Sequence, residues 1–343
     1  MERTLFATVD ELLDPDALGV LGAVSVRNVH CVPLHPVEAN SGSRFYLVET
    51  NDGTGPRYIL KRISPAKDSA IGDSKDYLNR SVTLWRHGLL DRLPSEVVHA
   101  VVACSHDGAG YAILMHDVSA ALMSGGGQFT LADHARFLDT MASMHAEFWE
   151  DPQLSDPRLG LRSRSYFFTD SQSGAEGWAF IEELLEPDVA EVVRTLLRDS
   201  RPIYDALMRY PSTLVHNDFW WANLGIVREE PSRVVLLDWD FATLAPPAVE
   251  LAYYIGENSR LLPVSNEAVV EDYRSSLARR LGARRDEDWW LPQLDLGFLG
   301  CFLRRGKWML LAASRAGSEK MHIESLHGLA WWSDQIRRGA QRL

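Results

Sequence analysis

The sequence has few cysteines, and they are badly placed for cross-linking or metal binding. Cys31, Cys104 and Cys301 are odd in number and far apart along the chain. This pattern argues against a disulfide framework or a cysteine-based metal site and favours reduced thiols. We therefore expect a cytoplasmic protein.

Positive charge is also scarce. Lys and Arg together number 35 against 47 Asp and Glu, which gives a formal net charge of −12 at pH 7. Such a charge repels phosphate backbones and anionic lipid surfaces. The composition thus disfavours nucleic acid and membrane surfaces as partners.

Long apolar segments are missing as well. The first residues lack a basic stretch followed by an apolar one, so no signal peptide is expected. The longest apolar region, 296–303, ends at Arg304 and Arg305, and a membrane-spanning helix needs roughly 20 such residues. We find no internal repeat, which excludes a solenoid or propeller.

What is present fits a globular chain of about two domains or one two-lobed unit. Hydrophobic residues make up 46% of the 343 residues and charged residues 24%, enough for a full core. The first third is β-rich: segments 44–50 and 57–63 flank a turn sequence and predict an antiparallel hairpin. A helix over 78–89 should follow, and then two further strands at 97–103 and 111–115.

After about residue 120 the chain changes to helical patterns. Thr130-Leu-Ala-Asp133 resembles a capping box and opens an amphipathic helix that should end near residue 149. Further helices are expected at 178–199, 265–281, 290–313 and 323–340, with a strand-rich insert at 213–242. The sequence therefore predicts an α+β fold with a small antiparallel β-rich lobe at 1–117 and a large, mostly helical lobe at 118–343.

The insert contains the residues that indicate chemistry. His216-Asn-Asp218 is followed five residues later by Asn223, and a hairpin then leads to Asp238-Trp-Asp240. That hairpin can fold Asp238 back beside Asn223, and such oxygen ligands suit magnesium together with substrate phosphates. A further carboxylate, Asp218, can accept the proton of a hydroxyl nucleophile during phosphoryl transfer. The alternative is that Asp218 and Asp238 only form turns or caps.

This segment resembles the catalytic loop and metal-binding strand of the aminoglycoside phosphotransferase and choline kinase-like family, which belongs to the protein-kinase-like superfamily. The family pattern is H-G-D-x-x-x-x-N, then an apolar run and D-[FW]-[DE]; here Asn217 stands where Gly is usual. A later family motif is present in altered form as Ala245-Pro-Pro-Ala-Val-Glu250. The resemblance implies a kinase-like two-lobed fold. It also implies transfer of the ATP γ-phosphoryl group, with magnesium, to a hydroxyl of an aminoglycoside, amino alcohol or similar small molecule.

The resemblance also assigns roles to individual residues. Asp218 would be the base, His216 an organiser of its loop, and Asn223 and Asp238 the metal ligands. Lys61, in Tyr58-Ile-Leu-Lys61, would contact the ATP phosphates. The remaining assignments are a loop over the phosphates (Ser41, Gly42, Ser43), a hinge that pairs with adenine (Met115, Asp117) and an acceptor side (Trp220, Asp240).

One departure from the family leaves the activity open. Kinase-like folds pair the phosphate-binding Lys with a Glu on the first helix, which falls near Asn79 or Ser81, and neither is acidic. Asp73 or Asp76 could substitute, or Lys61 could be held only by nucleotide. A catalytically impaired nucleotide-binding homologue is therefore an alternative function.

A protein kinase is disfavoured, because an Ala-Pro pair follows Asp240 within five residues and leaves no room for an activation segment. The expected partner is a small-molecule hydroxyl acceptor. The chain itself should be a monomer or homodimer.

Overall fold

The computed structural model describes residues 2–35, 42–64, 79–123, 127–161, 175–282 and 288–343. The chain forms two compact units. Unit 1 comprises Met1–Gly125 and Ala222–Asp240, and unit 2 comprises Gly126–Trp221 and Phe241–Leu343. The polypeptide therefore crosses from one unit to the other at three points.

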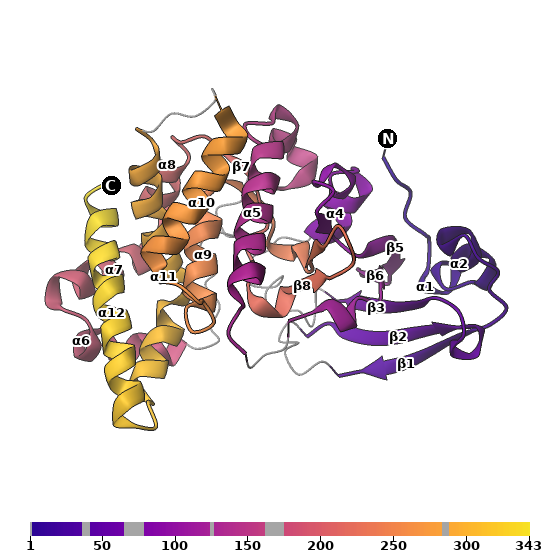
Figure 1. Ribbon diagram of the computed structural model, residues 1–343, viewed down its shortest axis with the longest axis horizontal. Helices are drawn as coiled ribbons and strands as arrows, with labels where there is room; N and C mark the ends of the chain where they lie inside the picture. The colour runs from indigo at the N-terminus through magenta and orange to yellow at the C-terminus, as the bar shows by residue number, and fades with distance from the viewer. Residues whose placement is uncertain (1, 36–41, 65–78, 124–126, 162–174, 283–287) are drawn as a thin grey trace. The chain divides into compact units, whose positions relative to one another are not determined.

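Unit 1 is built on a five-stranded antiparallel sheet in the order β1-β2-β3-β6-β5. Figure 1 shows β1, β2 and β3 side by side. The predicted hairpin is confirmed, since β2 and β3 pair on either side of the expected turn. The strands are Val29–Leu34, Arg44–Thr50, Arg57–Ile63, Val101–Asp107 (β5) and Gly110–His116 (β6).

Short helices complete the N-terminal part of unit 1. They are Val9–Leu12 (α1), Pro15–Gly22 (α2) and Arg80–Arg86 (α4). The helix predicted over 78–89 ends earlier than expected, because His87 caps it and Gly88 follows in a left-handed conformation with φ of 71°. The side chain of Asn79 caps its beginning by accepting a hydrogen bond from the Val82 N–H.

The predicted hairpin after residue 223 packs with unit 1. Its strands, Leu224–Val227 (β8) and Arg233–Leu236 (β9), pair with each other, and β9 also pairs in parallel with Val97–Val98 (β4). The N-terminal lobe predicted at residues 1–117 did not include this hairpin, which unit 1 contains. The pairing with β4 joins two parts of the chain that are more than a hundred residues apart.

Unit 2 is mostly helical (Figure 1). Its helices are Leu131–Glu147 (α5), Ile181–Leu184 (α6), Pro187–Arg198 (α7), Arg201–Leu207 (α8), Ala248–Asn258 (α9), Asn266–Leu281 (α10), Trp290–Ser314 (α11) and Glu319–Ala340 (α12). Two short strands, Thr213–Val215 (β7) and Thr243–Ala245 (β10), pair with each other. The α+β division into a sheet-based part and a helical part is thus confirmed.

One long predicted helix is interrupted in the structure. The segment predicted as a single helix over 178–199 is divided between α6 and α7. Pro187 is the first residue of α7, and Glu186 before it is extended, with φ of −64° and ψ of 149°. A residue before proline is driven out of the helical region by the proline ring, so the helix must restart there.

The core of unit 2 lies along α11, which packs against α9 and α12. Gly297 permits the close approach to α9, because a Cβ at this position would lie 2.8 Å from the Ala248 carbonyl oxygen. On the side toward α12, Phe298 and Phe302 have ring centroids 5.8 and 6.0 Å from that of Trp332. Because α11 is buried for most of its length, polar residues on it require partners inside unit 2.

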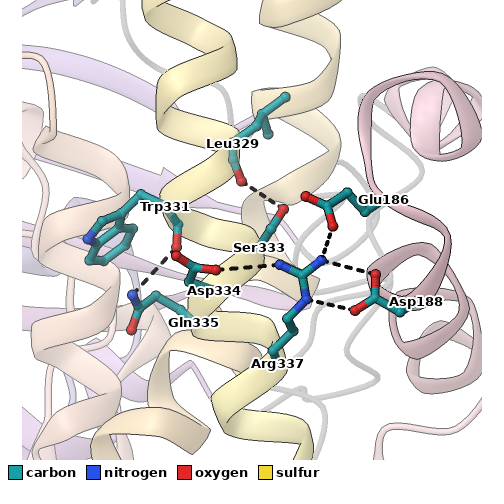
Figure 2. Close-up of polar contacts among 8 residues, drawn as sticks. All are labelled: Glu186, Asp188, Leu329, Trp331, Ser333, Asp334, Gln335 and Arg337. Carbon is teal, nitrogen blue, oxygen red and sulfur yellow. Dashed lines mark hydrogen bonds and ion pairs between the residues drawn. The ribbon is translucent and has the colours of Figure 1, made fainter.

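At the surface of unit 2, Arg337 joins α12 to the beginning of α7 (Figure 2). Its guanidinium donates to Asp188 at 2.7 and 3.0 Å and also contacts Glu186. These groups are exposed, so the ion pairs orient the two helices but add little to stability. In the described part of the chain, no helix is long and apolar enough to cross a membrane.

Candidate active site

The predicted site residues form two groups, one in each unit. The group in unit 1 surrounds the end of β9, and the group in unit 2 forms a loop after β7. Unit 1 contains Lys61, Asn223, Asp238 and Asp240, and unit 2 contains His216, Asp218 and Trp220.

In unit 1, Lys61 lies on the central strand β3 and is almost entirely buried, with 4% of its side chain exposed. Its ammonium nitrogen lies 2.9 Å from both carboxylate oxygens of Asp238 and 2.8 Å from Asp240 Oδ2. A buried ammonium without such partners would be strongly unfavourable. Of the alternatives for Lys61, the one in which it is held only by nucleotide is therefore wrong, and the lysine pairs with carboxylates other than the usual helix Glu.

The charges of this cluster do not cancel. Burial by itself would lower the pKa of Lys61, but the two carboxylates raise it above its ordinary value, so the ammonium remains charged. Burial would raise the pKa of Asp240, yet Lys61 and the Ser81 hydroxyl together lower it. Burial and the neighbouring charge of Asp240 raise the pKa of Asp238. Two carboxylates thus share one ammonium, and a further cation at Asp238 would be favourable.

The backbone also prepares Asp238 for a ligand. Its φ of 61° is left-handed, a conformation that Asp tolerates better than most residues and that turns its side chain out of the strand direction. The Leu237 N–H donates to the Asn223 carbonyl at 3.0 Å, so both ends of the β8–β9 hairpin meet beside Asp238. Among the described residues, no three His, Cys, Asp or Glu side chains gather into a protein-only metal centre. Asp238 offers a carboxylate and Asn223 an amide oxygen, which are the kinds of ligand that could hold magnesium.

Helix α4, which corresponds to the helix that carries the Glu in kinase-like folds, contacts the same cluster through a hydroxyl group. Ser81 on α4 donates to Asp240 Oδ1 at 2.6 Å. Asn79 instead caps α4, and Asp73 and Asp76 lie outside the described residues. The two carboxylates that hold Lys61 therefore come from the segment after β9.

In unit 2, the loop after β7 holds Asp218. The Asp218 N–H donates to His216 Nδ1 at 3.2 Å, and His216 is completely buried. The Asp218 carboxylate accepts a hydrogen bond of 2.6 Å from the Tyr253 hydroxyl. Burial, followed by the charge of Asp218, raises the pKa of Tyr253 well above its ordinary value, so this hydroxyl stays protonated and donates.

An arginine from α11 clamps this loop. Arg304 Nη1 donates to the Asn217 carbonyl at 2.8 Å and to Asn217 Oδ1 at 2.9 Å. Arg304 Nη2 lies 3.7 Å from Asp218 Oδ1, and the guanidinium stacks 4.2 Å from the Tyr253 ring centroid. The side chain of Arg304 is 8% exposed, so the clamp lies within unit 2 and its charge faces Asp218 with little screening by solvent.

A fully buried polar chain supports the loop from below. Glu250 on α9 accepts from the Asn217 N–H at 2.7 Å, and its other oxygen lies 2.8 Å from His145 Nε2. His145 Nδ1 lies 2.6 Å from the Tyr273 hydroxyl. Burial raises the pKa of Tyr273, so its hydroxyl stays protonated and can donate toward His145 Nδ1. This series of hydrogen bonds fixes the backbone of the loop at Asn217.

Asn258, at the end of α9, holds the following residues. Its Oδ1 accepts from the Trp221 N–H at 2.9 Å, and its Nδ2 donates to the Phe219 carbonyl at 3.1 Å. Each backbone group of the loop that pairs with α9 does so through a buried side chain. The loop is consequently rigid where Asp218 projects from it.

Comparison with known proteins identifies this arrangement. A family model described as "Phosphotransferase enzyme family" (APH) matches residues 34–289, which is most of the chain. The chain belongs to this phosphotransferase family. No curated protein matches it.

The chain is also similar to solved structures. A microcompartment-associated aminopropanol kinase has a TM-score of 0.54 and 15% identity, with 95% of this chain and 97% of that chain covered. The GDP complex of aminoglycoside 2′-phosphotransferase-IIIa has a TM-score of 0.49 and 15% identity, over 92% and 96% of the two chains. Choline kinase LicA from Streptococcus pneumoniae has a TM-score of 0.47 and 13% identity, also over 92% and 96%. The first of these supports the predicted kinase-like fold.

Of the nucleotide-side residues expected in a phosphotransferase of this family, Ser41 lies outside the described residues. Gly42 precedes β2 with φ of 74°, and the hydroxyl oxygen of Ser43 is buried, with no partner among the described residues. Met115 lies near the end of β6, and Asp117 follows that strand, where its carboxylate accepts from the Ser119 N–H and hydroxyl. Their roles toward a nucleotide stay predictions.

The predicted place of Trp220 on the acceptor side also stays a prediction. It is half-buried, and its ring centroid lies 5.4 Å from that of Trp221 in an edge-to-face arrangement. Within the described part of the chain, the contacts of this ring identify no acceptor. An aromatic face beside the base would suit an organic acceptor or a quaternary ammonium group.

Sequence reasoning missed several residues that shape the phosphotransferase site. Glu250 was visible as the acid of an altered family motif, and Arg304 as a charge directly after the apolar region 296–303 of a predicted helix. Such a charge, on a helix expected to be buried, indicates an internal partner. The Ser81 hydroxyl gave no signal, because only its distance to Asp240 reveals its part.

Proposed function

We propose that this phosphotransferase moves the γ-phosphoryl group of ATP to a hydroxyl group of a small molecule, with magnesium as cofactor. The observation that carries the proposal is the cluster in which Lys61 lies 2.9 Å from Asp238 and 2.8 Å from Asp240. It combines a buried cation suited to phosphate with a carboxylate suited to a divalent metal.

Lys61 would bind the α- and β-phosphates, and its rigid position on β3 would orient them. Asp238 and Asn223 would hold magnesium, which neutralises charge on the phosphate oxygens. The presence of two carboxylates around one ammonium supports a cation at this place.

Asp218 would act on the acceptor. Its carboxylate is held by Tyr253 and faces Arg304, and its backbone is fixed by His216. The acceptor oxygen forms a bond to the γ-phosphorus while the bond to the bridging oxygen of ADP breaks, and the hydroxyl proton passes to Asp218.

The alternative of a catalytically impaired nucleotide-binding homologue loses its main support. It rested on the missing helix acid, and Lys61 has two carboxylate partners without that acid. A protein kinase remains disfavoured by the short segment between Asp240 and α9, which begins at Ala248.

The acceptor class is best found by a screen of ATP consumption across aminoglycosides, macrolides, amino alcohols, sugars and sterols. Turnover that depends on one acceptor class supports the proposal. Binding of ATP without turnover against any acceptor would favour the impaired homologue.

The first prediction concerns Asp218→Asn. Because Asp218 meets the acceptor and not the nucleotide, kcat should fall by about a hundredfold or more while ATP affinity changes by less than about twofold. Steady-state kinetics and calorimetry measure the two quantities. A matched control is the exposed surface variant Asp188→Asn, which should retain kcat. If Asp218→Asn keeps more than about a tenth of wild-type kcat, Asp218 is not the base.

A further inference from the structure

The structure points to a positioning role for Ser81 and Asp240, which rests on the function proposed above. We infer that Asp240 is the permanent partner of Lys61 and that the Ser81 hydroxyl fixes Asp240 in the orientation that presents Lys61 to phosphate. Neither residue needs to touch the acceptor for this role.

The geometry divides the two oxygens of Asp240 between two donors. Oδ2 lies 2.8 Å from Lys61 Nζ, and Oδ1 accepts from the Ser81 hydroxyl at 2.6 Å. A carboxylate with both oxygens bound in this way cannot rotate without breaking one of two short, charge-assisted bonds. Ser81 is 3% exposed and Lys61 is 4% exposed, so water does not readily replace either donor.

Asp238 has a different environment. Its side chain is 32% exposed, against 15% for Asp240, and both of its oxygens lie 2.9 Å from Lys61 Nζ. A metal held by Asp238 would compete with Lys61 for that carboxylate, whereas Asp240 would remain the partner of the lysine. Two carboxylates around one lysine thus separate two tasks, since one is accessible to a cation and the other anchors the lysine.

The same contacts couple α4 to the lysine. Ser81 is the second residue of α4, whose beginning is capped by Asn79. A change in the position of α4 therefore reaches Lys61 through Ser81 and Asp240. Thr83 and Val82 on the same helix are buried as well, which keeps the helix in place.

The test uses the full-length protein and ADP as the probe. In the presence of a chelator, ADP affinity reports the phosphate contact of Lys61 without the metal. Ser81→Ala should weaken ADP binding by roughly three- to tenfold, because Lys61 is then less well oriented. Ser81→Thr keeps the hydroxyl and should bind ADP within about twofold of wild type.

Asn79→Ala is the matched control on the same helix. It removes the cap of α4 but touches neither Asp240 nor Lys61, so it should lower the melting temperature. Any loss of ADP affinity then reports the displacement of α4 alone and should be smaller than the loss in Ser81→Ala. If Ser81→Ala alters ADP affinity no more than Asn79→Ala does, the positioning role is refuted. Should Ser81→Ala fail to fold, the near-isosteric Ser81→Cys carries the same expectation, since a thiol is a weak donor.

Asp240→Asn tests the second half of the inference. It should weaken ADP binding at least as much as Ser81→Ala and leave the KM for the acceptor nearly unchanged. A raised acceptor KM with unchanged ADP affinity would return Asp240 to the acceptor side. If wild-type protein binds no ADP, the proposed function itself fails. If wild type binds ADP, Lys61→Ala does not, and Ser81→Ala binds ADP as tightly as wild type, only the positioning role fails.

Discussion

Asn217 shows how a single residue alters a family pattern without losing its backbone conformation. Glycine is usual at this position, and Asn217 has a left-handed φ of 61°, which Asn tolerates better than most residues. Its side chain supplies an acceptor that glycine lacks, and Arg304 Nη1 donates to that oxygen at 2.9 Å. The substitution therefore exchanges backbone freedom for a contact with α11.

The second prediction concerns substitutions of Asn217. Asn217→Gly keeps the conformation and removes one acceptor of Arg304, so kcat should fall by roughly three- to tenfold with ATP affinity unchanged. Asn217→Ala should cost about 1–2 kcal/mol more in stability, because alanine is strained at positive φ. Steady-state kinetics and chemical denaturation measure these effects.

Asn51→Gly is a suitable control, since Asn51 also has positive φ, at 53°, and its side chain is bonded to Ser25 and Arg27 in a turn of unit 1. It should lose stability and keep kcat. Equal losses of kcat in Asn51→Gly and Asn217→Gly would contradict a specific role for the Arg304 clamp.

At the scale of elements, helix α9 is the scaffold of the catalytic loop. Glu250, Tyr253 and Asn258 contact three successive parts of that loop. Their spacings of three and five residues keep them toward one side of a helix with 3.6 residues per turn. Because α9 is held against α11 at Gly297, the loop inherits the rigidity of the packed helices.

The third prediction tests this scaffold. Glu250→Gln keeps the volume but replaces one acceptor oxygen with an amide donor, which leaves either the Asn217 N–H or His145 without a partner. The free energy of unfolding should drop by about 1–3 kcal/mol, and kcat should fall more than ATP affinity. Thermal denaturation and kinetics measure both, with the exposed Glu271→Gln on α10 as a control that changes neither. An unaltered kcat in a folded Glu250→Gln protein would show that the loop needs no such support.

The spacing of apolar residues predicted most of the helices, because this spacing is a local property of the sequence. Helices α5, α10 and α11 agree with their predicted ranges, and α12 begins a few residues earlier, at Glu319. The interruption of the helix before Pro187 could also have been predicted from the sequence, since a proline restricts the conformation of the residue before it. The pairing of β7 with β10 was not predictable, because short strands such as these acquire their partners from the tertiary fold.

At the scale of the whole molecule, the chain distributes its proposed chemistry over two units. Asp218 belongs to unit 2, whereas Lys61, Asn223 and Asp238 belong to unit 1. Each unit has its own buried core, with Phe137 and Phe302 in unit 2 and Leu60 and Leu114 in unit 1. A ligand that binds the native protein and not the unfolded chain must raise the observed stability.

The fourth prediction uses this linkage. ATP with magnesium at about a hundred times its dissociation constant should stabilise the protein by about 2.7 kcal/mol, and ATP with a chelator at the same concentration should stabilise it less. Asp238→Ala should remove the part that depends on magnesium, and Asn223→Ala should reduce it, because a neutral amide oxygen is the weaker ligand. Thermal shift assays provide the measurement. If magnesium makes no difference to the wild type, the metal assignment is wrong.

The sequence by itself determined the family, the order of the main elements and the spacing of the reactive residues. His216, Asp218, Asn223 and Asp238 lie within 23 positions of one another. One loop contains His216 and Asp218, and one hairpin lies between Asn223 and Asp238. Such features depend on local conformation and side-chain type, which the chain carries in its linear order.

Only the tertiary structure decided which side chains complete the site. Lys61 and Asp238 are separated by 177 positions and Ser81 and Asp240 by 159, and Arg304 lies 87 positions beyond Asn217. Buried ionic and polar groups must find partners, but folding brings many candidates within reach, and the choice depends on the packing of whole elements. The missing helix acid could therefore be read from the sequence, whereas its replacement by a serine and a second carboxylate could not.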